Sequence, residues 1–128
     1  MSADLAKAIW ARLTAECDGA AGVYPVRLPD DADFPALVYQ QITGPRSYTL
    51  TAEAGPHRTT WQITAWGETY SDAKTLAEAA VAALSAWVDE TGDNVTDSVA
   101  FVASEFDLFD PASRLYYVPI DATILFVP

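Results

Sequence analysis

Histidine and cysteine are almost absent from this sequence of 128 residues, which contains one of each, His57 and Cys17. A zinc site requires several such ligands, and a single cysteine cannot form a disulfide within its own chain. The sequence therefore predicts neither a structural zinc site nor a disulfide framework. Cys17 falls near the end of a predicted helix, where we interpret it as a small buried hydrophobic residue.

Basic residues are also scarce, because 7 Lys and Arg stand against 18 Asp and Glu, which gives a net charge of −11. Such a surface repels phosphate, so we expect neither sequence-specific nucleic-acid binding nor attachment to an anionic membrane. Solubility alone is the simpler explanation of the acidity. No apolar run reaches membrane-spanning length, and the first residues do not resemble a secretory signal. These features favour a cytoplasm-like setting.

No motif for catalysis or phosphate binding stands out. The sequence has no nucleophile elbow and no glycine-rich phosphate loop, and His57 falls in a polar stretch that is expected to be solvated. Glu105 and Asp107, two apart on a predicted strand, formally offer a carboxylate pair, although a solvated strand face explains them more simply. The acidic residues 30–33 lack the glycine and distal glutamate of a calcium loop. We predict no catalytic residue, no cofactor and no metal.

Two segments have the spacing of amphipathic helices. In residues 3–17, apolar side chains recur every four positions, and Gly19 is expected to end the helix in a left-handed conformation. Residues 71–88 follow a capping-box-like spacing that starts at Thr69. Their apolar stripe is rich in alanine, and such a small-residue face packs closely on a sheet.

Four segments have the composition of strands: residues 37–43, 59–66, 99–106 and 115–127. Residues 23–31 contain two prolines, which indicates an extended connector. Residues 46–57 are polar and are expected to form a long loop or an extended hairpin arm, and loops of this length are often functional. Residues 109–113 have the composition of a turn. Pro119 cannot donate to a ladder, so it indicates an edge position or a bulge in the last strand.

The order helix, strand, strand, helix, strand, strand predicts an α+β fold in a single domain, residues 1–128. Each strand pair is joined without a helix, so antiparallel hairpins are expected. The predicted architecture is a four-stranded, mainly antiparallel sheet with two α-helices packed on one face. A long loop joins the first two strands.

The long loop is the candidate interaction site. Basic residues flank both ends of this loop, although the protein is largely acidic. This local positive charge would suit an acidic patch on a partner, but chance explains it equally well. An exposed sheet edge must be covered as well, and a ring of identical subunits covers it through head-to-tail contacts. The predicted partner-interface residues are Arg46, Tyr48, Leu50, His57 and Arg58.

Three stretches together resemble the tail-completion, or tail-to-head joining, family of long-tailed phages. Residues 23–29, followed by residues 34–40, are similar to a proline-bounded lead into a strand that ends in Tyr39-Gln40. Residues 61–73 are similar to a strand, an aromatic residue, a short polar turn and an alanine-rich helix, and residues 114–121 are similar to the closing strand. Order and spacing carry the resemblance, which covers nearly the whole chain. Pro119 departs from the family's usual unbroken strand.

The resemblance implies a structural virion protein, assembled in the bacterial host cytoplasm, that forms a hexameric ring at the head-proximal end of the tail tube. Such a ring ends tail-tube polymerisation and binds the neck of the head. The implied partners are further copies of the chain, the tail-tube protein and a head-neck connector or stopper protein. An acidic lumen would let DNA pass without sticking.

Three alternatives remain beside this interpretation. The first is a neighbouring connector or stopper protein. The second is a small enzyme with a carboxylate pair, which predicts a deep pocket and a carboxyl group of raised pKa. The third is a soluble ligand-binding module, which predicts an apolar cavity with convergent polar groups.

Overall fold

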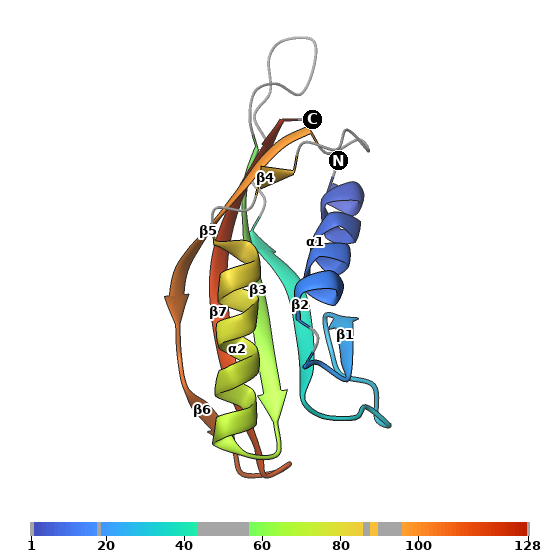
Figure 1. Ribbon diagram of the computed structural model, residues 1–128, viewed down its shortest axis with the longest axis vertical. Helices are drawn as coiled ribbons and strands as arrows, with labels where there is room; N and C mark the ends of the chain where they lie inside the picture. Colours follow the sequence, from blue (N-terminus) through green and yellow to red (C-terminus); the bar gives the residue numbers. More distant parts are fainter. Residues whose placement is uncertain (1, 18, 44–56, 86–87, 90–95, 128) are drawn as a thin grey trace.

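The computed structural model describes residues 2–17, 19–43, 57–85, 88–89 and 96–127, which form an α+β fold (Figure 1). The two helices are α1 (Ser2–Glu16) and α2 (Tyr70–Leu84). The strands are β1 (Gly22–Pro25), β2 (Ala36–Thr43), β3 (His57–Gly67), β4 (Val88–Asp89), β5 (Thr96–Glu105), β6 (Leu108–Asp110) and β7 (Leu115–Val127). No helix among these residues is long and apolar enough to cross a membrane.

In the described part of the chain, the sheet has seven strands in the order β1-β2-β3-β7-β5-β4, with β6 also pairing with β7. The prediction of four strands was therefore wrong, although the four predicted strands correspond to β2, β3, β5 and β7 and form the antiparallel centre. The additional strands are short, and β1 runs parallel to β2, so the sheet is mixed. Strand β7 lies between β3 and β5, which α2 connects as a split β-α-β unit.

Both helices lie over the same face of the sheet, as predicted (Figure 1). The core between the layers combines side chains from α1, α2 and alternate positions of the central strands. Its largest fully buried members are Ile9, Leu13, Leu37, Ile63, Leu84, Ile120, Ile124 and Val118. The small face of α2 is buried throughout, with Ala73, Ala77, Ala80 and Ala83 against the sheet. Cys17 is buried in this core as well.

Helix α2 begins as predicted but ends earlier. The Thr69 hydroxyl accepts a hydrogen bond from the Asp72 backbone N–H at 3.2 Å, which is the N-cap bond of the predicted capping spacing. The helix was predicted to reach Val88, but it ends at Leu84, and Ser85 takes an extended conformation. Val88 starts β4, in keeping with the strand preference of β-branched residues.

Helix α1 also ends differently from the prediction. Gly19 does not adopt the left-handed conformation expected of it. The chain instead continues from the helix through a hydrogen bond from the Ala20 N–H to the Cys17 carbonyl at 3.1 Å. The exit from α1 therefore does not depend on glycine.

Pro119 lies in the central strand β7, and no register shift occurs at this residue, so the predicted edge position or bulge was wrong. The Phe106 N–H donates to the Pro119 carbonyl at 3.1 Å, but Pro119 has no N–H with which to complete the pair. The ladder stops at this point, between Glu105, which pairs with Ile120, and Leu108, which pairs with Tyr117. Because the register on both sides of the gap is the same, β5 and β6 are one strand interrupted opposite a proline.

The turn predicted at residues 109–113 begins later in the structure. Phe109 and Asp110 belong to β6, and the turn follows them. The Asp110 carboxylate accepts hydrogen bonds from the Ala112 N–H at 3.2 Å and from the Ser113 hydroxyl at 2.8 Å. An aspartate at this position stabilises a turn through its own side chain.

Gly67 joins β3 to α2 at a point where the backbone is crowded. A Cβ atom added to Gly67 would lie 2.7 Å from the backbone nitrogen of Ala73, so the helix itself would have to move. We expect Gly67→Ala to lower the free energy of unfolding by about 1–3 kcal/mol, as overpacking does elsewhere. Urea unfolding measures this. Gly19→Ala is the matched control, because nothing lies within 4 Å of its added Cβ; equal losses in both variants would refute the explanation.

Candidate interaction surfaces

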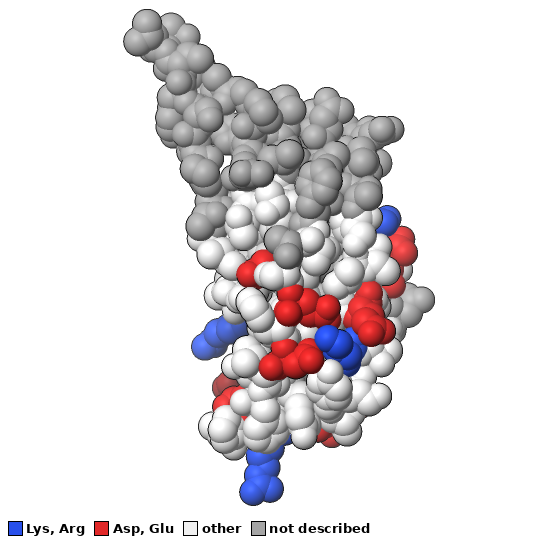
Figure 2. All heavy atoms as spheres, turned by 90° about the vertical axis from the view of Figure 1, so that its left-hand side faces the viewer, with Lys and Arg blue, Asp and Glu red and all other residues white. Residues whose placement is uncertain are grey.

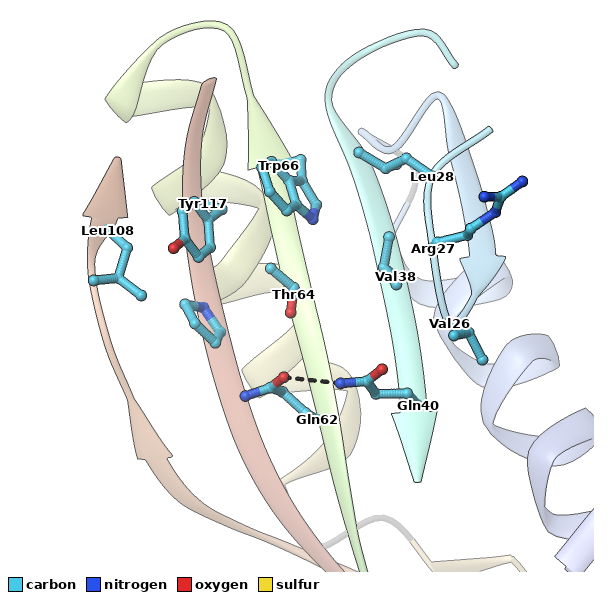
Figure 3. Close-up of a pocket in the computed structure, with 11 residues that line it drawn as sticks. Val26, Arg27, Leu28, Val38, Gln40, Gln62, Thr64, Trp66, Leu108 and Tyr117 are labelled. Carbon is cyan, nitrogen blue, oxygen red and sulfur yellow. Dashed lines mark hydrogen bonds between the residues drawn. The ribbon is translucent and has the colours of Figure 1, made fainter. Parts of the chain in front are cut away.

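The sheet face that the helices leave open carries a groove of about 470 Å³ (Figure 3). Strands β2, β3, β7 and β6 form its floor, and the segment after β1 forms one wall. Alternation along β3 places Gln62, Thr64 and Trp66 on this face, as the sequence predicted. The lining residues are Val26, Arg27, Leu28, Val38, Gln40, Gln62, Thr64, Trp66, Leu108, Tyr117 and Pro119.

An aromatic pair lies at the centre of the groove. Trp66 of β3 and Tyr117 of β7 are direct cross-strand partners. Their rings stack with centroids 4.6 Å apart and an angle of 17° between the planes (Figure 3). Aromatic cross-strand pairs stabilise sheets, and here they also give the open face an apolar centre.

A ladder of polar side chains crosses four strands beside this pair. Gln40 donates to Gln62 at 3.2 Å, and Gln62 donates to Asp121 at 3.5 Å. The Ser104 hydroxyl donates to the other oxygen of Asp121 at 3.1 Å. Each link joins residues that are opposite in the register. The ladder partners these part-buried polar groups with one another, so it works as a structural support of the open face.

The wall of the groove begins with a strained turn. Pro25 ends β1 without a donor, and the N–H of Val26 donates to the Tyr39 carbonyl at 2.8 Å. The Arg27 N–H donates to the Pro25 carbonyl at 2.7 Å. Val26, at the centre of this γ-turn, has a φ of 66°, which is unfavourable for a β-branched residue. Its side chain is 66% exposed, so burial does not offset the strain.

A charged cluster links α2 to the interrupted strand. The ammonium group of Lys74 lies 3.0 Å from Glu105 and 2.9 Å from Asp107. The Tyr70 hydroxyl donates to the second oxygen of Asp107 at 2.9 Å. Figure 2 looks onto this side of the molecule, where acidic side chains gather around a basic one. Glu105 and Asp107 thus share a side, as predicted, and both bind the same cation.

The cluster shifts the proton affinities of three groups. Hydrogen bonds from Lys74, and then from Tyr70, lower the pKa of Asp107 below its ordinary value. Hydrogen bonds to Asp107 and then Glu105 raise the pKa of Lys74, and the bond to Asp107 raises the pKa of Tyr70. The Asp107 contribution to stability is present above the ordinary carboxylate pKa and is lost as the pH falls through the lowered value. The Lys74 and Tyr70 contributions are lost as the pH rises through their raised values.

We expect Lys74→Met to return the Asp107 pKa toward its ordinary value of 3.8, because the largest cause of the lowered pKa is removed. NMR titration of the side-chain carboxyl carbons measures the change directly. Lys7→Met is the matched control, since Lys7 is exposed on α1, away from the cluster. An Asp107 titration that is unchanged by Lys74→Met would contradict the assigned cause.

The residues predicted for the partner interface lie largely outside this description. Arg46, Tyr48 and Leu50 fall in residues 44–56, outside the described part of the chain. His57 and Arg58 open β3, where their backbones pair with Phe126 and Leu125, and their side chains also fall outside the description. The predicted site therefore stays a prediction.

The Glu105 and Asp107 pair does not match the enzyme alternative. The pKa of Asp107 is lowered, whereas the enzyme alternative predicts a carboxyl group of raised pKa. Glu105 and Asp107 therefore act as an ion-paired link between helix and strand.

Sequence reasoning missed the groove and the Lys74 cluster. The signal for the groove was the alternation in β3, but its wall comes from a segment that was predicted only as a connector. Lys74 and Asp107 are 33 positions apart, so no local pattern joins them. Both features depend on strand register, which the four-stranded prediction did not include.

The described residues thus form an α+β protein whose sheet has an open, grooved face. The sequence profile of the family described as "Tail completion protein gp17" matches residues 7–126. The chain belongs to this family of tail completion proteins, and it is a structural protein of a phage-like tail.

One solved structure illustrates the fold. It is described as "Virion of native gene transfer agent (GTA) particle", and the chain aligns to it with a TM-score of 0.61 and 13% identity. The alignment covers 92% of this chain and 90% of that chain. At this identity the likeness shows a shared fold. No curated protein matches the sequence significantly.

Proposed function

We propose that this chain, as a single domain spanning residues 1–128, forms a hexameric ring at the head-proximal end of the tail tube. The ring ends tube polymerisation and joins the tail to a connector or stopper protein of the head neck. The observation that carries the proposal is the family match, which spans residues 7–126. The fold shared with a chain of a gene transfer agent virion supports a place in a phage-like particle.

The acidity of the chain supports passage of DNA through such a ring. A net charge of −11 makes a lumen wall built from this chain repel phosphate, so DNA would slide without being held. A structure of the assembled ring with a basic channel wall would contradict this part of the proposal.

Tube capping tests the proposed function. Purified tail-tube protein is polymerised with and without the chain, and tube lengths are measured by electron microscopy. The proposal expects shorter tubes that carry a ring at one end. Tubes of unchanged length with bare ends, at a molar excess of the chain, would contradict it.

We further propose that Arg46, Tyr48, Leu50, His57 and Arg58 contact the tube or a neighbouring subunit. Arg58 pairs with Leu125 near one end of the β3–β7 ladder, whereas Lys7 is an exposed residue of α1. Arg58→Glu is expected to reduce capping or ring formation, and Lys7→Glu is the matched control. Equal behaviour of the two variants would place the contact elsewhere.

A further inference from the structure

The two lateral edges of the sheet carry almost all of the large apolar side chains that the described residues expose. Seven such side chains are exposed, and six of them lie beside β6 or β1, whereas Ile42 lies on β2 beyond the segment that pairs with β1. The β6 edge carries Tyr70, Phe106, Leu108 and Phe109, and the β1 edge carries Trp10 and Val26. Clustered apolar side chains of this kind mark interaction sites, and aromatic residues are enriched at the centres of protein interfaces.

Contacts fix these side chains at their edges. The Tyr70 hydroxyl binds Asp107, next to β6, and the Phe109 ring lies 4.9 Å from the ring of Tyr116. On the other side of the sheet, the Trp10 indole N–H donates to the Val23 carbonyl of β1 at 3.2 Å. In Figure 3, Leu108 and Val26 lie on opposite sides of the open face. Each edge therefore presents exposed apolar side chains beside its strand.

Within the described ranges, each edge strand has one side on which no other strand pairs, although the Val23 carbonyl of β1 accepts the Trp10 indole N–H. Among the described residues, β1 pairs with β2 alone and β6 pairs with β7 alone. An edge strand with apolar side chains is a template for pairing with another chain, unless something covers it. Figure 2 looks onto the β6 side, where uncharged surface extends below the charged cluster.

The register places the two free edges at the same level of the sheet. A single row of partners runs from one edge to the other through Gly22, Ala36, Trp66, Tyr117 and Leu108. The strands also run in opposite directions, because β1 is parallel to β2 and each later step to β6 is antiparallel. A second copy in the same orientation thus presents β1 to β6 as an antiparallel, level partner.

We infer that β6 of one copy pairs with β1 of the next, so that the sheet continues from subunit to subunit. This inference rests on the proposed ring, for which it supplies the contact between neighbouring subunits. The contact is heterologous, because each copy uses a different edge on each side, and repetition of such a contact closes a ring when the rotation allows it. Phe106, Leu108 and Phe109 then meet Val26 and Trp10 across the junction.

Two single substitutions test the two edges one at a time. Leu108→Glu places a charge on the β6 edge, and Val26→Asp places one on the β1 edge, where aspartate also tolerates a positive φ. Both substitutions introduce a negative charge, so the two substituted edges repel each other in a mixture. Light scattering after size-exclusion chromatography is expected to show oligomers for the wild type and monomers for each variant. Self-association should weaken about thirtyfold or more, as for a central interface residue.

Mixing the two variants gives the sharper result. Each variant keeps one intact edge, so an equimolar mixture is expected to form a heterodimer and nothing larger. A mixture that stays monomeric, or a wild type that is monomeric at every concentration, would overturn the inference. Circular dichroism checks folding, and Phe106→Glu replaces Leu108→Glu if the latter lowers Tm. Ile42→Lys is the matched control. Loss of assembly in that variant would also overturn the inference that copies associate through the β6 and β1 edges.

Failure of this inference and failure of the proposed function give different results. If the edge variants still assemble and cap tubes as the wild type does, the subunit contact lies elsewhere and the terminator role stands. If the wild type assembles through these edges and the mixture forms heterodimers, but tubes grow to full length, the contact stands and the terminator role fails.

Discussion

Replacing Ile120 by Ala is expected to lower the free energy of unfolding by about 2–5 kcal/mol, the cost of a large-to-small substitution in a core. Ile120 is fully buried, and it lies in β7 between Ile63 of β3 and Glu105 of β5. The cavity would therefore open at the centre of the sheet, beneath the helices. Domains of this size have a total stability of about 5–15 kcal/mol, so the loss is a large part of the whole.

Chemical unfolding followed by tryptophan fluorescence measures the loss, at a fixed protein concentration because self-association raises apparent stability. Ile42→Ala is the matched control, since it makes the same chemical change at a side chain that is 48% exposed. Its expected cost is about 0.5 kcal/mol or less. A cost for Ile120→Ala close to that of the control would show that the β7 centre is not the core described here.

The elements with a long, regular pattern were predictable from the sequence. Alternation over the 11 residues of β3 and the 13 of β7 assigns each side chain to a face, because successive residues point to opposite sides. The spacing of α2 likewise identifies the side that packs on the sheet. Together with the order of the elements along the chain, these two signals correctly predicted the α+β class with both helices on one face.

The short edge strands were not predictable, and the physical reason is their length. β1 has 4 residues and β6 has 3, too few for a period of two to stand out from chance. Pro25 ends β1, and Pro119 of β7 faces the gap before β6. Proline argues against a strand when only the local sequence is considered. In both places the neighbouring strand, and not the local sequence, holds the backbone extended.

The candidate surfaces were harder still to predict from the sequence, because they depend on which strands pair and in which register. The sequence directed attention to the roots of a long loop, whereas the apolar edges combine residues such as Trp10 and Val26, or Tyr70 and Phe109, from separate elements. Leu108 falls between the strand predicted at residues 99–106 and the turn predicted at residues 109–113, and only the pairing of β6 with β7 identifies it as a residue of an edge strand. Exposure and edge position become visible only when strands are placed next to one another.

The second large effect is expected at Thr59, the one buried polar side chain of the described core. Its hydroxyl donates to the Ile124 carbonyl at 3.0 Å and accepts the indole N–H of Trp61 at 2.9 Å. This hydroxyl is what permits a tryptophan, 3% exposed, to lie inside the core with its N–H bonded. Thr59→Val keeps the shape but leaves the Trp61 donor without this partner, which should cost about 1–3 kcal/mol.

A double-mutant cycle with Trp61→Phe isolates this bond from the loss of packing. Phenylalanine has no N–H to leave unpaired, so Thr59→Val should cost less in the Trp61→Phe protein than in the wild type. The expected coupling energy is about 1 kcal/mol, within the range for residues in direct contact. Chemical unfolding of the four proteins gives the coupling, and the indole proton resonance of Trp61 should shift in Thr59→Val. Additive costs, with the indole resonance unmoved, would mean that Trp61 is stabilised by packing alone.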